Sequence, residues 1–188
     1  MDLSPDKHQI LEALLLHNET SIKAAQIAKE TGKPQGTAQM HLIGLVKMGY
    51  ATSPKKGSYI ISPGGKKALG LPEVTREKAL AILAPTPRDK AFHFYADIGK
   101  PLNVYAPDLL DFCDRICQVN VESVQFHVCR GDFESWFKSL GDEELAKKMA
   151  LVKAKNLCGE ELREEIRKMV ECRCAALSKM VGQTPNRP

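Results

Sequence analysis

The sequence SIKAAQIAKETGKPQGTAQMHLIGLVKMGYATSPKKGSYII, residues 21–61, determines how the first part of the chain folds. It contains two short helical patterns separated by a turn at Gly32-Lys33, followed by two short apolar runs joined by residues 54–57. Between Lys33 and Lys67 the chain carries six lysines and no aspartate or glutamate. A helix pair, a hairpin and unopposed positive charge together indicate a surface suited to DNA.

A further helix is predicted ahead of this stretch. Ser4-Pro5 is a typical helix start, because proline is well tolerated in the first turn. Four large apolar side chains then recur at helical spacing and form one apolar face. They are Ile10, Leu11, Leu14 and Leu15. We expect this helix to end near His17-Asn18.

The two helical patterns of the central stretch have recognisable ends. Ser21 is the expected N-cap of the second helix, which stops at Gly32. Pro34 opens the third helix, and Gly49 ends it. The residues predicted to face inward are Ala24, Ile27 and Ala28 in the second helix and Ala38, Leu42, Leu45 and Val46 in the third.

The next segments complete a familiar order of elements. Residues 51–53 and 58–61 have strand character, residues 54–57 form a turn, and Ser62-Pro63 starts a short helix. This order resembles the winged helix-turn-helix domains of bacterial and archaeal transcription regulators. The resemblance is carried by Ile27-Ala28, Gly32, Ala38, Leu42, Leu45, Gly49-Tyr50 and Ser62-Pro63-Gly64-Gly65-Lys66. It implies double-stranded DNA as a partner, and a homodimer, since such regulators commonly bind two-fold sites.

The excess positive charge is confined to the first part of the chain. Residues 1–70 hold nine lysines and five acidic residues, whereas residues 71–188 hold 18 basic and 18 acidic residues. No apolar run has the length of a membrane span, and the polar start MDLSPDKHQ is unlike a signal peptide. We therefore expect a cytoplasmic protein whose six cysteines are reduced thiols.

The second half is predicted to be a separate domain. Residues 1–70 form the DNA-binding domain, residues 71–90 a linker with a short helix, and residues 91–182 an α/β domain for sensing or dimerisation. Residues 91–95 and 121–129 alternate like strands, with a helix between them. This pattern suggests a crossover onto a small parallel sheet that later helices cover, so the predicted fold class is α+β.

Three segments of this half resemble a small domain family of uncharacterised function from archaeal and bacterial proteins. They are FHFY, VESVQFHVCRGDFESW and DEELA, and the resemblance spans residues 90–180. It implies a fold and no activity. Asp132 and Asp142 are expected to cap the helices that follow them. The helices expected at 143–157 and 160–180 either form a dimer interface or cover the sheet of their own chain.

The outward face of the third helix is the candidate surface for contacts with bases. A recognition helix enters the major groove with its N-terminal residues nearest the bases. Gln35 and Gln39 match adenine N7 and N6, and Met40 suits a thymine methyl group. Gly36 allows a close approach of the backbone, and lysines supply phosphate contacts. The full predicted DNA-binding set is Lys33, Gln35, Gly36, Thr37, Gln39, Met40, Lys47, Lys55 and Lys56.

Cysteines and histidines of the second half are weaker candidates for a site. No CxxC spacing occurs, so neither a metal nor a cofactor is predicted. Cys113 and Cys117 share a helix face, which leaves open a redox pair, or a metal site completed by His127 and Cys172 or Cys174, beside buried structural thiols. His93, His127 and Cys129 are predicted to lie on one polar sheet face. That face is either a pocket for a small-molecule effector or a solvated surface.

Two alternatives to a DNA-binding regulator remain at this point. Residues 1–70 contain no arginine, although arginine to guanine is the commonest specific base contact. The winged helix is therefore alternatively a protein–protein interaction module. A small enzyme using His127 and Cys129 is the third hypothesis, but no third catalytic group is evident and we predict no reaction.

Overall fold

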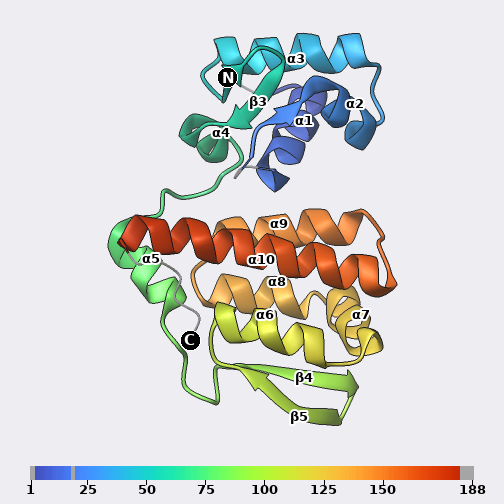
Figure 1. Ribbon diagram of the computed structural model, residues 1–188, viewed down its shortest axis with the longest axis vertical. Coiled ribbons are helices and arrows are strands. Elements are labelled where there is room, and N and C mark those ends of the chain that lie inside the picture. Colours follow the sequence, from blue (N-terminus) through green and yellow to red (C-terminus); the bar gives the residue numbers. More distant parts are fainter. Residues whose placement is uncertain (1–2, 18–19, 183–188) are drawn as a thin grey trace. The chain divides into compact units, whose positions relative to one another are not determined.

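The computed structural model describes residues 3–17 and 20–182. The chain divides into two compact units, with the boundary between Glu73 and Val74. A three-stranded sheet belongs to the first unit and a two-stranded sheet to the second, each accompanied by helices (Figure 1). This architecture confirms the predicted α+β class. Within the described residues, no helix has both the length and the apolar character that a membrane span requires.

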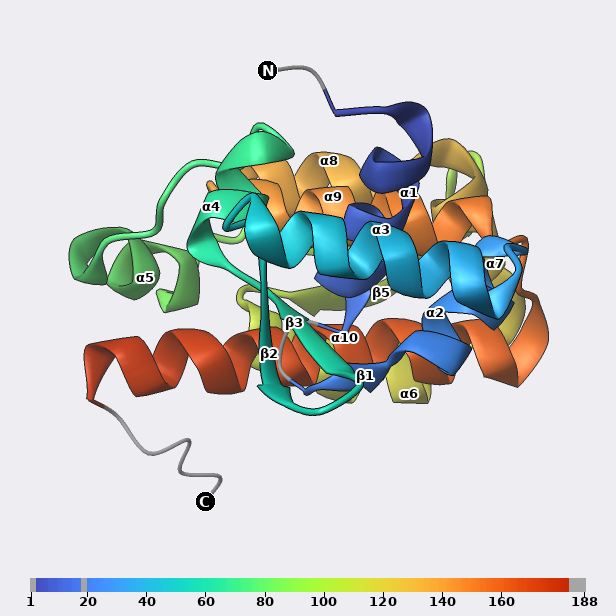
Figure 2. The same cartoon turned by 90° about the horizontal axis from the view of Figure 1, so that it is seen from above.

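The first unit has the element order of a winged helix-turn-helix domain. Its elements are α1 (Pro5–Leu16), β1 (Ile22–Lys23), α2 (Ala24–Thr31), α3 (Gln35–Lys47), β2 (Ala51–Lys55), β3 (Ser58–Ile61) and α4 (Pro63–Ala68). The strands pair antiparallel in the order β1-β3-β2. Figure 2 shows the β2–β3 hairpin leaving the end of α3 and running beside β1. The hairpin is the wing of this unit.

The apolar stripes predicted from the sequence form the core of the first unit. The side chains at its centre are inaccessible to solvent: Ile10, Leu11, Leu14, Leu15, Ile27, Ala38, Leu42 and Leu45. Val46 is only half-buried. The predicted cap at Ser21 is wrong, because Ile22 pairs with Tyr59 and Lys23 with Ser58 in a short strand. The second helix therefore starts at Ala24.

Ser62 connects the wing to the end of α3. Its hydroxyl donates a 2.6 Å hydrogen bond to the carbonyl of Gly49 and accepts one of 3.0 Å from the N–H of Gly65. A Cβ atom on Gly65 would overlap the carbonyl oxygen of Tyr50, so only glycine allows α4 to pack this closely. One hydroxyl thus ties together α3, β3 and α4.

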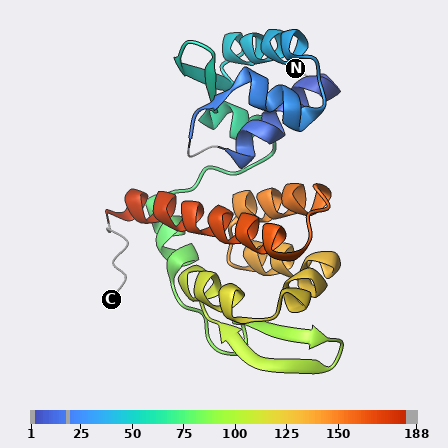
Figure 3. The same ribbon diagram turned by 45° about the vertical axis from the view of Figure 1, so that its right-hand side comes forward.

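The second unit places a hairpin and helices around an aromatic core. Its elements are α5 (Arg76–Leu83), β4 (Phe92–Asp97), β5 (Lys100–Ala106), α6 (Leu109–Gln118), α7 (Val121–Arg130), α8 (Asp132–Ser139), α9 (Glu143–Ala154) and α10 (Gly159–Val181). In Figures 1 and 3 the β4–β5 hairpin lies on one side of α6 and α7, and α9 and α10 lie on the other. The rings of Phe112 and Phe133 meet edge to face at 5.1 Å in this core.

The prediction of a parallel sheet is wrong. Strand β4 pairs with β5 in an antiparallel hairpin through a turn at Ile98-Gly99, where Gly99 has φ of +71°. Residues 121–129, expected to be a strand, belong to helix α7. Val124 and Val128 are buried at helical spacing, and this period determined the fold even though valine favours strands.

Helix α5 belongs to the second unit, although the sequence placed it in a linker at residues 71–90. Ala79 and Ile82 are fully buried, and the Arg76 guanidinium donates a 3.2 Å hydrogen bond to the carbonyl of Val181 at the end of α10. The helix therefore closes one end of α10. Asp142 caps α9 as predicted, accepting a hydrogen bond from Leu145 N.

Candidate nucleic-acid interface

One face of α3 is exposed to solvent. Ala38, Leu42 and Leu45 pack inward, against the core formed with α1 and α2. The opposite face is exposed, and its two apolar side chains are Met40, 61% exposed, and Ile43, 43% exposed. The other exposed residues of this face are Gln35, Gly36, Gln39 and Lys47. Thr37 is half-buried at the edge of the face.

A shallow groove runs along this exposed face. It is lined by Gly36, Gln39, Met40, Ile43, Gly44 and Lys47. A Cβ atom built on Gly36 would have no described atom within 4 Å apart from its chain neighbours and the helix backbone, so packing inside the first unit does not require glycine there. A glycine in a helix costs up to about 1 kcal/mol relative to alanine. The small residue leaves room for a partner that lies against the helix backbone.

The wing carries two exposed lysines. Lys55 ends β2 opposite Ser58, and Lys56 lies with Gly57 in the turn. The turn is therefore shorter than the predicted 54–57, because Pro54 and Lys55 belong to the strand. The Ser53 hydroxyl lies 3.0 Å from the carbonyl oxygen of Ser58 and supports the hairpin. Both lysine side chains are open to solvent and available to an anion.

Lys33 has a different environment from the other lysines of the predicted set. Its ammonium group lies 2.6 Å from a carboxylate oxygen of Asp6, and its side chain is mostly buried. The hydrogen bond and charge of Lys33 lower the pKa of the Asp6 carboxyl. His41 faces the other oxygen of Asp6 at 3.6 Å. Lys33 therefore fastens the turn before α3 to α1.

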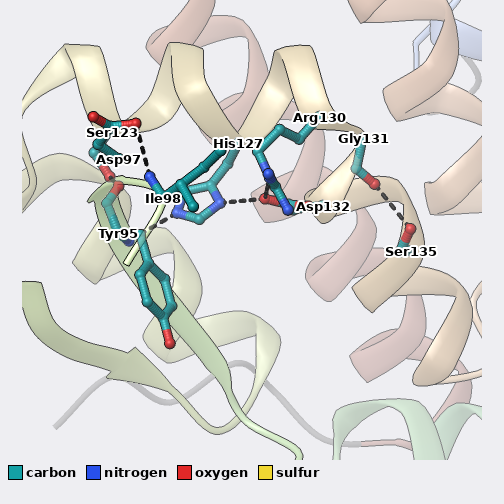
Figure 4. A network of polar contacts seen from close by, with 9 residues as sticks. All are labelled: Tyr95, Asp97, Ile98, Ser123, His127, Arg130, Gly131, Asp132 and Ser135. Atoms are coloured by element: carbon teal, nitrogen blue, oxygen red, sulfur yellow. Dashed lines mark hydrogen bonds and ion pairs between the residues drawn. The ribbon is translucent and has the colours of Figure 1, made fainter. Parts of the chain in front are cut away.

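The second unit contains a buried histidine that joins β4 to α7. The N–H of Tyr95 donates a 2.9 Å hydrogen bond to Nε2 of His127, so the neutral ring carries its proton on Nδ1. Nδ1 in turn donates a 2.7 Å hydrogen bond to Asp132. Figure 4 shows these contacts with the Ser123 hydroxyl, which donates to the carbonyl of Tyr95, and with Arg130, which lies 3.1 Å from Asp132.

Comparison with known families accounts for both units. Residues 76–171, just over half of the chain, match the family of unknown function DUF5752. The chain belongs to the DUF5752 family. Residues 8–54 match the IclR helix-turn-helix domain. At family level, this match supports a DNA-binding transcription regulator and indicates a regulator rather than an enzyme. Comparisons with curated proteins and with solved structures gave no match.

The second unit, called the DUF5752 unit from here on, does not contain the predicted polar sheet face. That face required His127 and Cys129 on a strand, whereas α7 is a helix in which two residues of this spacing point to different sides. His93 stacks on Tyr105 and bonds to the carbonyl of Arg88 at 2.8 Å. His93 and His127 still line one hollow of about 270 Å³, but their rings have different partners.

Asp132 was expected to cap α8 but has another role. It is the first residue of that helix, and Gly131 holds the cap position. The Asp132 carboxylate instead accepts a hydrogen bond from Nδ1 of His127. Burial lowers the pKa of His127, and Asp132 opposes that effect. In the sequence, His127 is only a polar residue in an alternating run. Its partners could therefore be predicted only if residues 121–130 were recognised as a helix.

Cys113 and Cys117, which the sequence left open as a redox pair, are free thiols in different environments, Cys113 buried and Cys117 exposed. Hydrogen bonding to Cys174 and burial raise the pKa of Cys113, so these two thiols are neighbours between α6 and α10. Cys117 is exposed and donates to the carbonyl of Cys113 at 3.4 Å, and partial desolvation of its sulfur raises the pKa of the thiol. Cys129 is exposed and has Gln125 beside its sulfur. Within residues 3–17 and 20–182, no three metal-ligating side chains cluster.

A buried cluster of charges in the DUF5752 unit was missed. The Arg173 guanidinium binds both carboxylate oxygens of Asp142 at 2.7 and 2.9 Å, and it lies 3.0 Å from Glu144. Glu144 in turn pairs with Lys148 at 3.3 Å. Arg173 occupies the position between Val170 and Leu177 in the apolar stripe of α10. An arginine within an apolar stripe was the signal in the sequence that could have indicated this buried cluster.

Proposed function

We propose that the protein is a sequence-specific transcription regulator in which α3 lies in the major groove of double-stranded DNA. The exposed face of α3 carries this proposal, because its polar and apolar side chains are open to solvent in the part of the first unit that the structure describes. The N-terminal residues Gln35, Gly36 and Gln39 lie nearest the bases, as in other recognition helices. Thr37 and Met40 complete the contacts of this first half of the helix.

The lysines of the first unit contact phosphates. Lys47 at the end of α3 and Lys55 and Lys56 on the wing are exposed, and no acidic residue lies between Lys33 and Lys67 to oppose them. Phosphate contacts position a protein on the duplex without reading its sequence. Lys33 differs from these lysines because it forms an ion pair with Asp6. We therefore propose that Lys33 orients α3 and does not make a strong phosphate contact.

The test is a titration of fluorescent duplex DNA of random sequence with the full-length protein, followed by anisotropy. Affinity is expected to fall by at least tenfold between about 50 and about 200 mM salt, because bound lysines release counterions. Salt-insensitive binding, or no binding at the lower salt concentration, would contradict the proposal. The winged helix would then be a protein–protein module.

The DUF5752 unit is proposed to mediate dimerisation, or to respond to an effector at the hollow lined by His93 and His127. For the dimer, the supporting observation is that Leu80 on α5 and Met180 on α10 are exposed apolar residues on two helices that pack together. Sedimentation analysis of the full-length protein tests this directly. A dimer that Met180→Lys dissociates supports it, and a monomer at all concentrations contradicts it.

A further inference from the structure

We infer that α3 selects A·T over G·C base pairs through contacts in the major groove. This inference rests on the proposed DNA-binding function and specifies the sequence class that the same surface recognises. It follows from the chemistry of the exposed side chains, which differ in kind from those that recognise G·C pairs.

The exposed part of α3 nearest the bases offers amides and apolar groups. Gln35 and Gln39 supply the donor and acceptor that match the N7 and N6 of adenine. Guanine is read by arginine or lysine, and residues 1–73 contain no arginine. Cytosine is read by acidic side chains, and α3 contains none. Lys47 lies in the last turn of the helix, where a phosphate is nearer than a base.

Met40 and Ile43 extend the argument to thymine. They are three residues apart on one helix face, beside Gln39, and remain largely exposed. Covering two neighbouring, exposed apolar side chains with methyl groups of a partner is favourable, because it removes apolar surface from water. Thymine is the one common base that presents a methyl group in the major groove. Met40 and Ile43 therefore match thymine, and Gln35 and Gln39 match adenine, which are the two bases of an A·T pair.

The space at Gly36 allows this contact. Within the described part of the first unit, no atom beyond the neighbouring residues and the helix's own backbone lies within 4 Å of a Cβ atom placed there, and glycine itself presents no side chain to the groove. DNA can then approach closely enough for Gln35 and Gln39 to reach base edges. A bulkier residue would hold the helix away from the bases.

The test compares three random pools of duplex DNA, built from A·T pairs, G·C pairs or inosine·C pairs, with the full-length protein. Inosine lacks the 2-amino group of guanine, so inosine·C shows the major-groove pattern of G·C and the minor-groove pattern of A·T. The A·T pool is expected to bind about tenfold more tightly than both other pools. Equal binding of the A·T and inosine·C pools would show minor-groove selection and overturn the inference.

Two further outcomes separate this inference from the proposed function. Equal, salt-dependent binding of all three pools would overturn the A·T preference but leave DNA binding intact. An absence of binding to every pool at low salt would overturn both. Replacing thymine by uracil removes only the methyl group, and it is expected to weaken binding several-fold.

The variant Met40→Ala with Ile43→Ala is expected to abolish the difference between thymine and uracil duplexes. The matched control is Leu110→Ala, which removes an exposed apolar side chain from the second unit and should preserve that difference. A double variant that still discriminates thymine from uracil would contradict the assignment of these two side chains.

Discussion

The backbone N–H of Tyr95 donates a 2.9 Å hydrogen bond to Nε2 of His127, whose ring is almost completely buried. An imidazolium has no lone pair at this nitrogen and cannot accept the bond. Protonation of His127 therefore breaks a hydrogen bond between β4 and α7 and leaves the Tyr95 N–H without its acceptor. The charged and titratable groups beside the ring are Asp132 and Arg130.

We expect the DUF5752 unit to lose stability as the pH falls below about 6.5. Burial lowers the pKa of His127 in the folded state, against the opposing effect of Asp132. As the pH falls through the unfolded pKa, the unfolded chain binds a proton that the folded state does not, which favours unfolding. The contribution of His127 is fully present above that pH. Urea unfolding followed by the fluorescence of Trp136, the one tryptophan, measures this.

The variant His127→Gln provides the control for this pH dependence. It removes the titrating group, so its stability should change less between about pH 7.5 and about pH 5.5 than that of the natural protein. At the higher pH the variant should be less stable by about 1–3 kcal/mol, because buried polar groups lose partners. If acidification destabilises both proteins equally, another group is responsible.

Arg173→Met is expected to destabilise the DUF5752 unit strongly. It leaves the carboxylates of Asp142 and Glu144 buried without their guanidinium partner, and breaking such a pair costs about 3–5 kcal/mol. Arg167→Met is the matched control, since Arg167 lies on the same helix and also pairs with two carboxylates near the surface. Equal losses in urea unfolding would show that burial of the cluster is unimportant.

Gly36→Ala should weaken DNA binding without destabilising the first unit. The added methyl group has free space within the protein, and alanine favours the helix by up to about 1 kcal/mol. Anisotropy titrations measure affinity, and thermal unfolding followed by circular dichroism measures stability. Gly65→Ala is the contrasting variant, because its methyl group overlaps the carbonyl of Tyr50 and should lower the unfolding temperature. Unchanged DNA affinity in Gly36→Ala would contradict close approach at that position.

Lys55→Ala combined with Lys56→Ala should weaken binding to all sequences alike. The slope of log affinity against log salt concentration is expected to decrease by about one for each lysine that no longer reaches a phosphate. The control is Lys90→Ala with Lys138→Ala, which removes two exposed lysines from the second unit and the same total charge. A slope that falls equally in both double variants would point to net charge rather than to the wing.

Much of the first unit was predictable because its signals are local. The stripes of α1 and α3, the left-handed Gly32 and the turn before Ser58 each depend on residues close in the chain. Strand β1 was not predictable, since two residues carry no period and pair only with β3, more than thirty residues away. The outward face of α3 followed from its inward face, so the candidate site was predictable to the same degree.

The second unit was harder to predict because one segment supported two periods. Residues 121–130 contain three valines and alternate in polarity, yet Val124, His127 and Val128 are buried together on a helix. Burial of one face of this segment favours the helical period over the strand period. That burial depends on Phe92, Phe94 and other residues that are distant in sequence. The partners of His127 and Arg173 depended on the same tertiary contacts.

The hydroxyl of Ser62 has a consequence for how the wing meets DNA. Because it joins the end of α3 to β3 and α4, the separation between the exposed face of α3 and the wing lysines is established when the unit folds. Little conformational freedom of the wing then remains to be lost on association. Pre-organisation of this kind makes the spacing between groove contacts and phosphate contacts a property of the protein, to which the DNA must conform.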